Sequence, residues 1–166
     1  FMPSYSLETV SAVRETIYRA TLALDDQRWK DWLALCSPDF HYAITSFSPE
    51  INKDMIYLQG DYKDMENMVR MLPKHNTDHS PLHRHTSVYT VDIADDGRSA
   101  EALSSVVFFQ NMLDGTNSHI DSGESRLFLL GKYIDTFKVE DGIAMFVKRE
   151  VRLDNRRLDK GSHWPL

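Results

Sequence analysis

Long stretches of alternating apolar and polar residues in the second half of the sequence constrain its fold more than any other feature. Four segments carry this alternation: residues 87–93, 99–113, 125–139 and 143–153. Asp96-Gly97 and Asp141-Gly142 are typical of tight hairpin turns between such strands. The last three segments are longer than an average strand of roughly 5–6 residues. We therefore expect long antiparallel strands in a strongly curved sheet.

Two of these segments support more specific predictions. Residues 99–113 are apolar in both phases of the alternation, which indicates a central strand covered on both sides. In the last segment, the phase predicted to face inward contains Ile143, Met145, Val147, Val151 and Leu153. The phase predicted to face outward contains Phe146, Lys148, Glu150, Arg152 and Asp154. Arg149 is then a polar break on the inward side.

The first half of the sequence has helical periodicity instead. One apolar stripe contains Leu7, Val10, Val13, Ile17, Ala20 and Leu24, at steps of three and four residues. A shorter stripe runs from Trp29 to Cys36. A third helix is expected from Asp61 to Pro73, where proline stops it. Residues 40–47 read as a strand. Three helices followed by a strand meander predict one α+β domain over residues 1–166, with the sheet wrapped around the first helix as an open cone.

Cysteine content and charge exclude several classes of protein. The chain has a single cysteine, Cys36, so it can form neither an intrachain disulfide nor a thiolate zinc site, and it cannot hold an iron–sulfur cluster alone. Its net charge of −6 does not suit a nucleic-acid partner. No apolar run is long enough to predict a membrane span. A reducing, cytoplasmic location fits this composition.

Histidines cluster before the long strands, at His75, His79, His83 and His85. A spacing of four residues places two ligands on one face of a helix. Pro73 and Pro81 argue against a helix through this stretch, so we expect a polar loop that leads into a strand, with no metal site.

Acid–base chemistry has three candidate residues. Asp39 and His41 flank the start of the first strand, and His85 lies near the start of a later one. A carboxylate and an imidazole at the mouth of a cone pocket suit general acid–base catalysis. A turn aspartate and a half-exposed histidine explain the same residues without any catalysis.

The last two strands and the final residues offer candidate subunit contacts. They are Lys132, Asp135, Lys148, Arg149, Arg152 and Trp164. Cross-strand ion pairing on a solvated face explains the charged residues equally well.

Three motifs carry a family resemblance through their order and spacing. They are Ala20–Arg28 followed by Asp39-Phe40-His41-Tyr42; Ser80-Pro81-Leu82-His83-Arg84-His85; and Gly131–Asp135 followed by Glu140-Asp141-Gly142 and Arg149–Asp154. The chain resembles the small (beta) subunit of Rieske non-heme iron ring-hydroxylating oxygenases, within the NTF2-like superfamily. It differs at Lys132 and Tyr133, where that family usually has two arginines, and at Leu82 and His83, which replace its usual Ser-Arg.

The resemblance implies an NTF2-like or cystatin-like cone that assembles as a homotrimer and joins an oxygenase alpha subunit, as alpha3beta3. The [2Fe-2S] Rieske cluster and the mononuclear iron are expected on the alpha subunit, with no cofactor and no catalytic residue in this chain. The substrate stays open among aromatic acids, hydrocarbons and small sulfonates.

Two alternatives remain on the residues alone. The first is a stand-alone NTF2-like isomerase, dehydratase or hydrolase that uses Asp39, His41 and His85. The second is a ligand-binding module without chemistry.

Overall fold

The computed structural model describes residues 4–75, 80–113, 123–155 and 164–166. The helices described are α1 (Ser4–Asp25), α2 (Trp29–Ala34) and α3 (Tyr62–His75). The strands are β1 (Cys36–Ser48), β2 (Lys53–Asp61), β3 (Leu82–Ile93), β4 (Ser99–Asn111), β5 (Ser125–Glu140) and β6 (Ile143–Leu153). The order of helices and long strands is as predicted. β2 was not anticipated, and α3 continues past Pro73.

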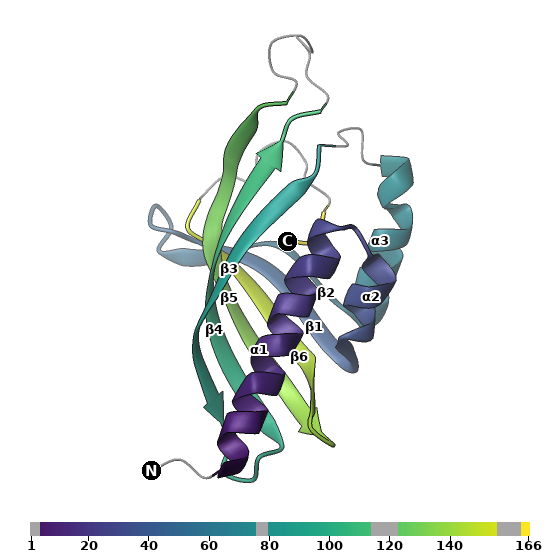
Figure 1. Cartoon of the computed structure of the whole chain (residues 1–166). Coiled ribbons are helices and arrows are strands. Elements are labelled where there is room, and N and C mark those ends of the chain that lie inside the picture. The colour runs from purple at the N-terminus through teal and green to yellow at the C-terminus, as the bar shows by residue number, and fades with distance from the viewer. Residues whose placement is uncertain (1–3, 76–79, 114–122, 156–163) are drawn as a thin grey trace.

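All six strands form one sheet in the order β2-β1-β6-β5-β4-β3 (Figure 1). The neighbouring pairs are antiparallel except β1 and β6, which run parallel. The expectation of a wholly antiparallel sheet is therefore wrong at one place. A parallel pair needs a long crossover between its strands, and everything from β2 to β5 supplies it here.

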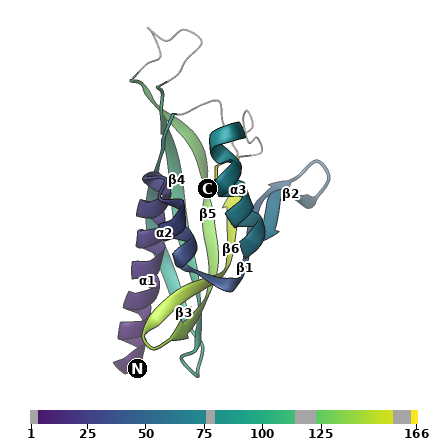
Figure 2. The same ribbon diagram turned by 90° about the vertical axis from the view of Figure 1, so that its right-hand side faces the viewer.

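The helices cover the concave face of this sheet, with α1 lying along it (Figures 1 and 2). Val13, Ile17, Ala20 and Leu24 of α1 are buried in the common core, as their periodicity predicted. Trp32 of α2 packs edge-on against Phe40 and Tyr42 of β1 at ring distances of 6.1 and 6.0 Å. The predicted α+β cone with helices packed in a curved sheet is confirmed.

The predicted facing of β6 is wrong in its first half. Phe146 is 1% exposed and Ile143 is 62% exposed, the reverse of the expectation. The reason is a bulge: Thr136 pairs with Lys148 and Phe137 pairs with Phe146, so Val147 is an extra residue. One extra residue reverses the facing of the side chains on its two sides relative to each other. The predicted facing is therefore wrong before Val147 and correct after it, where Val151 and Leu153 face inward.

Gly131 of β5 allows the close approach of β5 to β6. A Cβ atom at this position would overlap the main-chain carbonyl oxygen of Arg152. We expect Gly131→Ala to lower the free energy of unfolding by about 1–3 kcal/mol, because the two strands must separate to admit the methyl group. Chemical denaturation of the variant, compared with Ser87→Ala on an exposed position of β3, measures this. If Gly131→Ala has the same free energy of unfolding as that control, β5 and β6 can separate at this point without measurable cost.

Candidate functional site

The three candidate acid–base residues do not meet in the structure. Asp39 and His41 are exposed on β1, where they alternate with the buried Phe40 and Tyr42. His85 is exposed on β3, and β6, β5 and β4 lie between the two strands. None of the three side chains lies among the buried residues inside the cone. The catalytic role of these residues in the alternative hypothesis stays untested, but the geometry does not assemble them.

Part of the histidine cluster lies on one side of β3. The rings of His83 and His85 are 4.9 Å apart, and His83 Nδ1 lies 3.9 Å from an oxygen of Asp25. The side chain of His75 and all of His79 lie outside the described residues. Within the residues described, no group of three or more histidine, cysteine, aspartate or glutamate side chains could hold a metal ion.

Two of the predicted contact residues are buried in the interior. Arg149 of β6 and Asp135 of β5 are each 1% exposed and form a two-pronged ion pair, with Nε–Oδ1 and Nη2–Oδ2 distances of 2.8 and 3.0 Å. This corrects the expectation that both lie on a contact surface. Because the bulge at Val147 places Arg149 in the inward phase, its charge needs a partner inside the core, and Asp135 is the cross-strand neighbour.

Aromatic rings complete the environment of this pair. The Arg149 guanidinium carbon lies 3.7 Å from the ring centre of Tyr133 and 4.6 Å from that of Phe146. Burial disfavours the charged guanidinium, but Asp135 more than offsets this and holds the pKa of Arg149 above its usual value. Arg149 therefore stays positively charged at the centre of the fold.

A second buried arginine was missed by the sequence reasoning. Arg84 of β3 is 4% exposed, and its Nη1 lies 2.8 Å from Oδ1 of Asp25 at the end of α1. The main-chain N–H of Arg84 also donates to the Asp25 carboxylate over 3.1 Å. The signal was available: Arg84 shares its strand phase with Leu82, whereas the conspicuous His83 and His85 occupy the exposed phase.

The remaining charged candidates lie on the convex side of the sheet. Lys132 and Lys148 are exposed, and Arg152 is half-buried, with Nη2 2.8 Å from Asp54. Lys132 Nζ lies 3.7 Å from Asp154.

Trp164 is half-buried against Trp29 of the same chain. Lys132, Lys148, Arg152 and Trp164 stay candidates for subunit contact.

The same convex side carries an apolar band, which we call the outer band. Three cross-strand pairs of β4 and β5 form it: Leu103–Ile134, Val107–Leu130 and Phe109–Leu127. The polar pair Ser105–Lys132 lies between the first two. These side chains are half-buried or exposed, whereas their strand neighbours Val106 and Phe108 are buried. In the described part of the chain β4 is therefore covered on one side only. Because β4 is apolar on both sides, its outward side, the outer band, is an apolar surface that no described residue covers.

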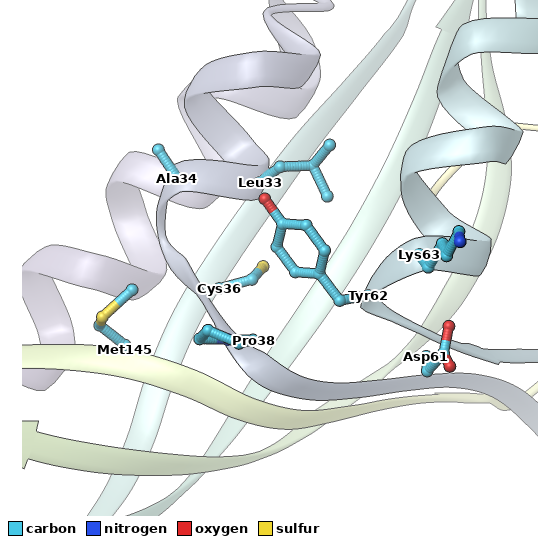
Figure 3. Close-up of a pocket in the computed structure, with 8 residues that line it drawn as sticks. All are labelled: Leu33, Ala34, Cys36, Pro38, Asp61, Tyr62, Lys63 and Met145. Atoms are coloured by element: carbon cyan, nitrogen blue, oxygen red, sulfur yellow. The ribbon is translucent and has the colours of Figure 1, made fainter.

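A hollow of about 470 Å³ lies between α2, the start of β1 and the start of α3 (Figure 3). Its lining residues are Leu33, Ala34, Cys36, Pro38, Asp61, Tyr62, Lys63 and Met145. Cys36 supplies the thiol of this lining. Burial raises the pKa of this thiol to about 12, and Sγ lies 3.5 Å from the carbonyl oxygen of Trp32.

We expect Cys36 to be unreactive in the folded protein. With so high a pKa, about one thiol in ten thousand is ionised at a pH of ~8, and only the thiolate attacks disulfide reagents. Titration with Ellman's reagent checks this: the native chain should react at a small fraction of the rate of the chain in denaturant. Equal rates would show that the hollow exposes a reactive thiolate.

No helix in the described part is both long and apolar enough to cross a membrane.

The fold is that of a known class of protein. The family model for the SnoaL-like domain matches residues 5–150. Among solved structures, the chain resembles one assigned as the beta subunit of an aromatic-ring-hydroxylating dioxygenase from Novosphingobium aromaticivorans. That similarity has a TM-score of 0.73 and 23% identity, and it covers 89% of this chain and 90% of that one. At this identity it shows the NTF2-like fold alone.

Two protein sequences are similar over nearly the whole chain. The beta subunit of the methanesulfonate monooxygenase hydroxylase from Methylosulfonomonas methylovora is 62% identical over 164 residues, which are 99% of this chain and 91% of that protein. The beta subunit of 2-aminobenzenesulfonate 2,3-dioxygenase from an Alcaligenes species is 29% identical over 160 residues, 96% of this chain and 100% of that protein. The chain belongs to the SnoaL-like domain family and, within it, to the beta subunits of multicomponent oxygenases. The resemblance seen in the sequence is confirmed, and the oxygenase subunit is favoured over the stand-alone enzyme.

Proposed function

We propose that this chain is the non-catalytic assembly subunit of an oxygenase that acts on a small sulfonate. The observation that carries this proposal is the 62% identity to the beta subunit of a methanesulfonate monooxygenase, which extends over nearly the full length of both chains. The more distant dioxygenase relative is also named for a sulfonate substrate. A small sulfonate is therefore favoured over the aromatic acids and hydrocarbons that the sequence left open.

The redox centres are proposed to lie on a separate alpha subunit. A Rieske [2Fe-2S] cluster needs two cysteines and two histidines, and this chain has one cysteine. No close set of three metal-ligating side chains occurs among the described residues. This chain alone therefore cannot ligate the Rieske cluster, and the described residues do not fit a mononuclear iron, which supports a role for the chain as the partner of the subunit that binds both.

The outer band supports a homotrimer, and with the alpha subunit an alpha3beta3 complex. Half-exposed pairs such as Val107–Leu130 make most of this surface apolar, the Ser105–Lys132 pair interrupts it, and Arg152 of β6 lies beside Lys132 at its edge. A largely apolar surface beside charged side chains suits a subunit contact. Copies of this chain that cover each other's outer band would complete the second covered side of β4. A cytoplasmic location is part of this proposal.

Co-expression with an oxygenase alpha subunit from the same organism tests the proposed function. The two chains should copurify, and with the reductase the complex should consume oxygen and NADH when methanesulfonate is added. His41→Ala and His85→Ala should leave this turnover unchanged within about twofold, because neither side chain touches the reacting centre. A loss of more than about tenfold in an intact complex, or turnover by this chain alone, would overturn the non-catalytic role.

A further inference from the structure

The hairpin of β1 and β2 carries a second apolar surface on the outside of the molecule. Its turn, residues 49–52, projects from the body of the molecule (Figures 1 and 2). Phe47, Ile51 and Ile56 are 44%, 59% and 56% exposed, and we call these three side chains the hairpin patch. A group of large apolar side chains that stays exposed in the single chain is typical of an interaction site.

The hairpin patch lies on the same convex side of the sheet as the outer band. Ile56 is the cross-strand partner of Thr45, and Thr45 pairs in turn with Arg152 of β6. Phe47, Lys132 and Arg152 also line one hollow of about 390 Å³. The two apolar surfaces are therefore neighbours, separated by the charged side chains at the end of β6.

A polar network on this side holds the hairpin to the rest of the sheet. Arg152 Nη2 donates to Oδ1 of Asp54 on β2 over 2.8 Å, so the arginine side chain reaches across β1. Arg152 Nη1 donates to Oε1 of Glu150 over 3.4 Å, and Thr45 Oγ1 donates to the same oxygen over 2.7 Å. Four side chains from three strands thus fix the direction in which the hairpin projects. A surface held in this way loses little conformational freedom when it docks.

A closed ring of three copies needs two different surfaces on each chain. In such a ring every contact is heterologous, which means that one surface of a copy meets a different surface of the next copy. The outer band is one such surface, and the hairpin patch is a second one beside it. Each copy can then turn its hairpin patch to one neighbour and its outer band to the other.

The charges of the two surfaces are of opposite sign. Residues 103–109 and 127–134, which contain the outer band, include one charged residue, Lys132. Residues 47–56, which contain the hairpin patch, include two carboxylates and one lysine. Lys132 belongs to an exposed ion pair with Asp154 at 3.7 Å, and such a pair is worth little. Its ammonium group can therefore turn toward a carboxylate of another copy at small cost.

We propose that the hairpin patch of one copy packs on the outer band of the next copy, so that three such contacts close the homotrimer. The inference rests on the proposed homotrimer and adds which two surfaces meet in it. Phe47 and Ile56 cover apolar pairs such as Val107–Leu130, and the carboxylates of the hairpin lie on the side of Lys132.

Ile56→Asp tests the part played by the hairpin. Its side chain is exposed in the single chain, so water solvates the carboxylate there and circular dichroism should show a folded protein. In the contact the carboxylate would be buried among apolar side chains. Native mass spectrometry should show that the trimer falls by more than about a hundredfold in favour of single chains of 19.2 kDa. Gln59→Glu adds a charge at an exposed position of the same strand, outside the patch, and should leave the trimer intact.

A mixture of two variants tests the pairing itself. Val107→Asp disrupts the outer band and leaves the hairpin patch intact, whereas Ile56→Asp does the reverse. One intact surface of each kind is then present in the mixture. We expect a species of about 38 kDa, two copies of the 19.2 kDa chain, that contains one chain of each variant and that neither variant forms alone.

The outcomes separate this inference from the proposed function. A trimer that persists in Ile56→Asp would overturn the inference and leave the homotrimer standing, even if the variant no longer bound the alpha subunit. Two monomeric variants that form no mixed pair would also overturn it. An unaltered chain that is not a trimer would contradict the proposed homotrimer and the inference together. If Ile56→Asp does not fold, Ile51→Asp in the exposed turn replaces it.

Discussion

Asp135→Ala is expected to lower the free energy of unfolding by about 3–5 kcal/mol, because it leaves the Arg149 guanidinium charged and unpaired in the core. Both side chains are almost completely buried, so water cannot replace the lost carboxylate. A protein of this size has a total stability of roughly 5–15 kcal/mol. Differential scanning calorimetry should therefore show a fall of about 10 °C in melting temperature.

Two further variants show that the effect belongs to the unpaired charge. Lys132→Ala removes one partner of an exposed ion pair, with Asp154, and should leave the melting temperature essentially unchanged. Asp135→Leu/Arg149→Met removes both buried charges and should recover most of the lost stability. If Asp135→Ala costs less than about 1 kcal/mol, the buried pair has no structural importance.

Val107→Asp is expected to abolish the proposed homotrimer while the monomer stays folded. Val107 lies in the centre of the outer band, opposite Leu130 on β5 and His85 on β3. It is half-buried in the single chain, so water still solvates a carboxylate there. Between subunits the same carboxylate would be buried without a partner, at a cost of several kcal/mol per copy. The assembled fraction should fall by more than about a hundredfold.

Native mass spectrometry measures this result directly. The unaltered chain should give a species of about 58 kDa, three copies of the 19.2 kDa chain, and the variant should give single chains. Ser11→Asp adds the same charge on the exposed side of α1 and should leave the trimer intact. Circular dichroism shows whether the variant is folded. A trimer that persists in Val107→Asp would place the subunit contact elsewhere.

Local periodicity was sufficient to predict most of the elements. The stripe of Val13, Ile17 and Ala20 identified α1 and its buried face correctly, because the spacing of apolar residues along a helix follows from its own turn. The two-sided apolar pattern of β4 also carries information that the single chain does not use. It predicts a second covering surface, and only the inner one is supplied by the residues described.

The side of the sheet to which each side chain points, and the pairing of distant strands, could not be predicted from local periodicity. The extra residue at Val147 reverses the alternation of β6, and nothing local distinguishes it from its neighbours. β2 was missed, since its pairing with β1 depends on residues outside its own short segment. The buried Arg84–Asp25 pair was missed for the same reason. The two residues are 59 positions apart in the sequence and meet only when α1 lies against β3.

The sequence by itself therefore determined the class of fold and, through the order of three motifs, the family. The tertiary structure decided which charged residues face inward, that Asp135 and Arg149 pair in the core, and that Trp164 packs against Trp29. The physical reason is that periodicity depends on neighbours a few residues apart, whereas the burial of a charge depends on a partner that only the folded sheet and helices bring within reach.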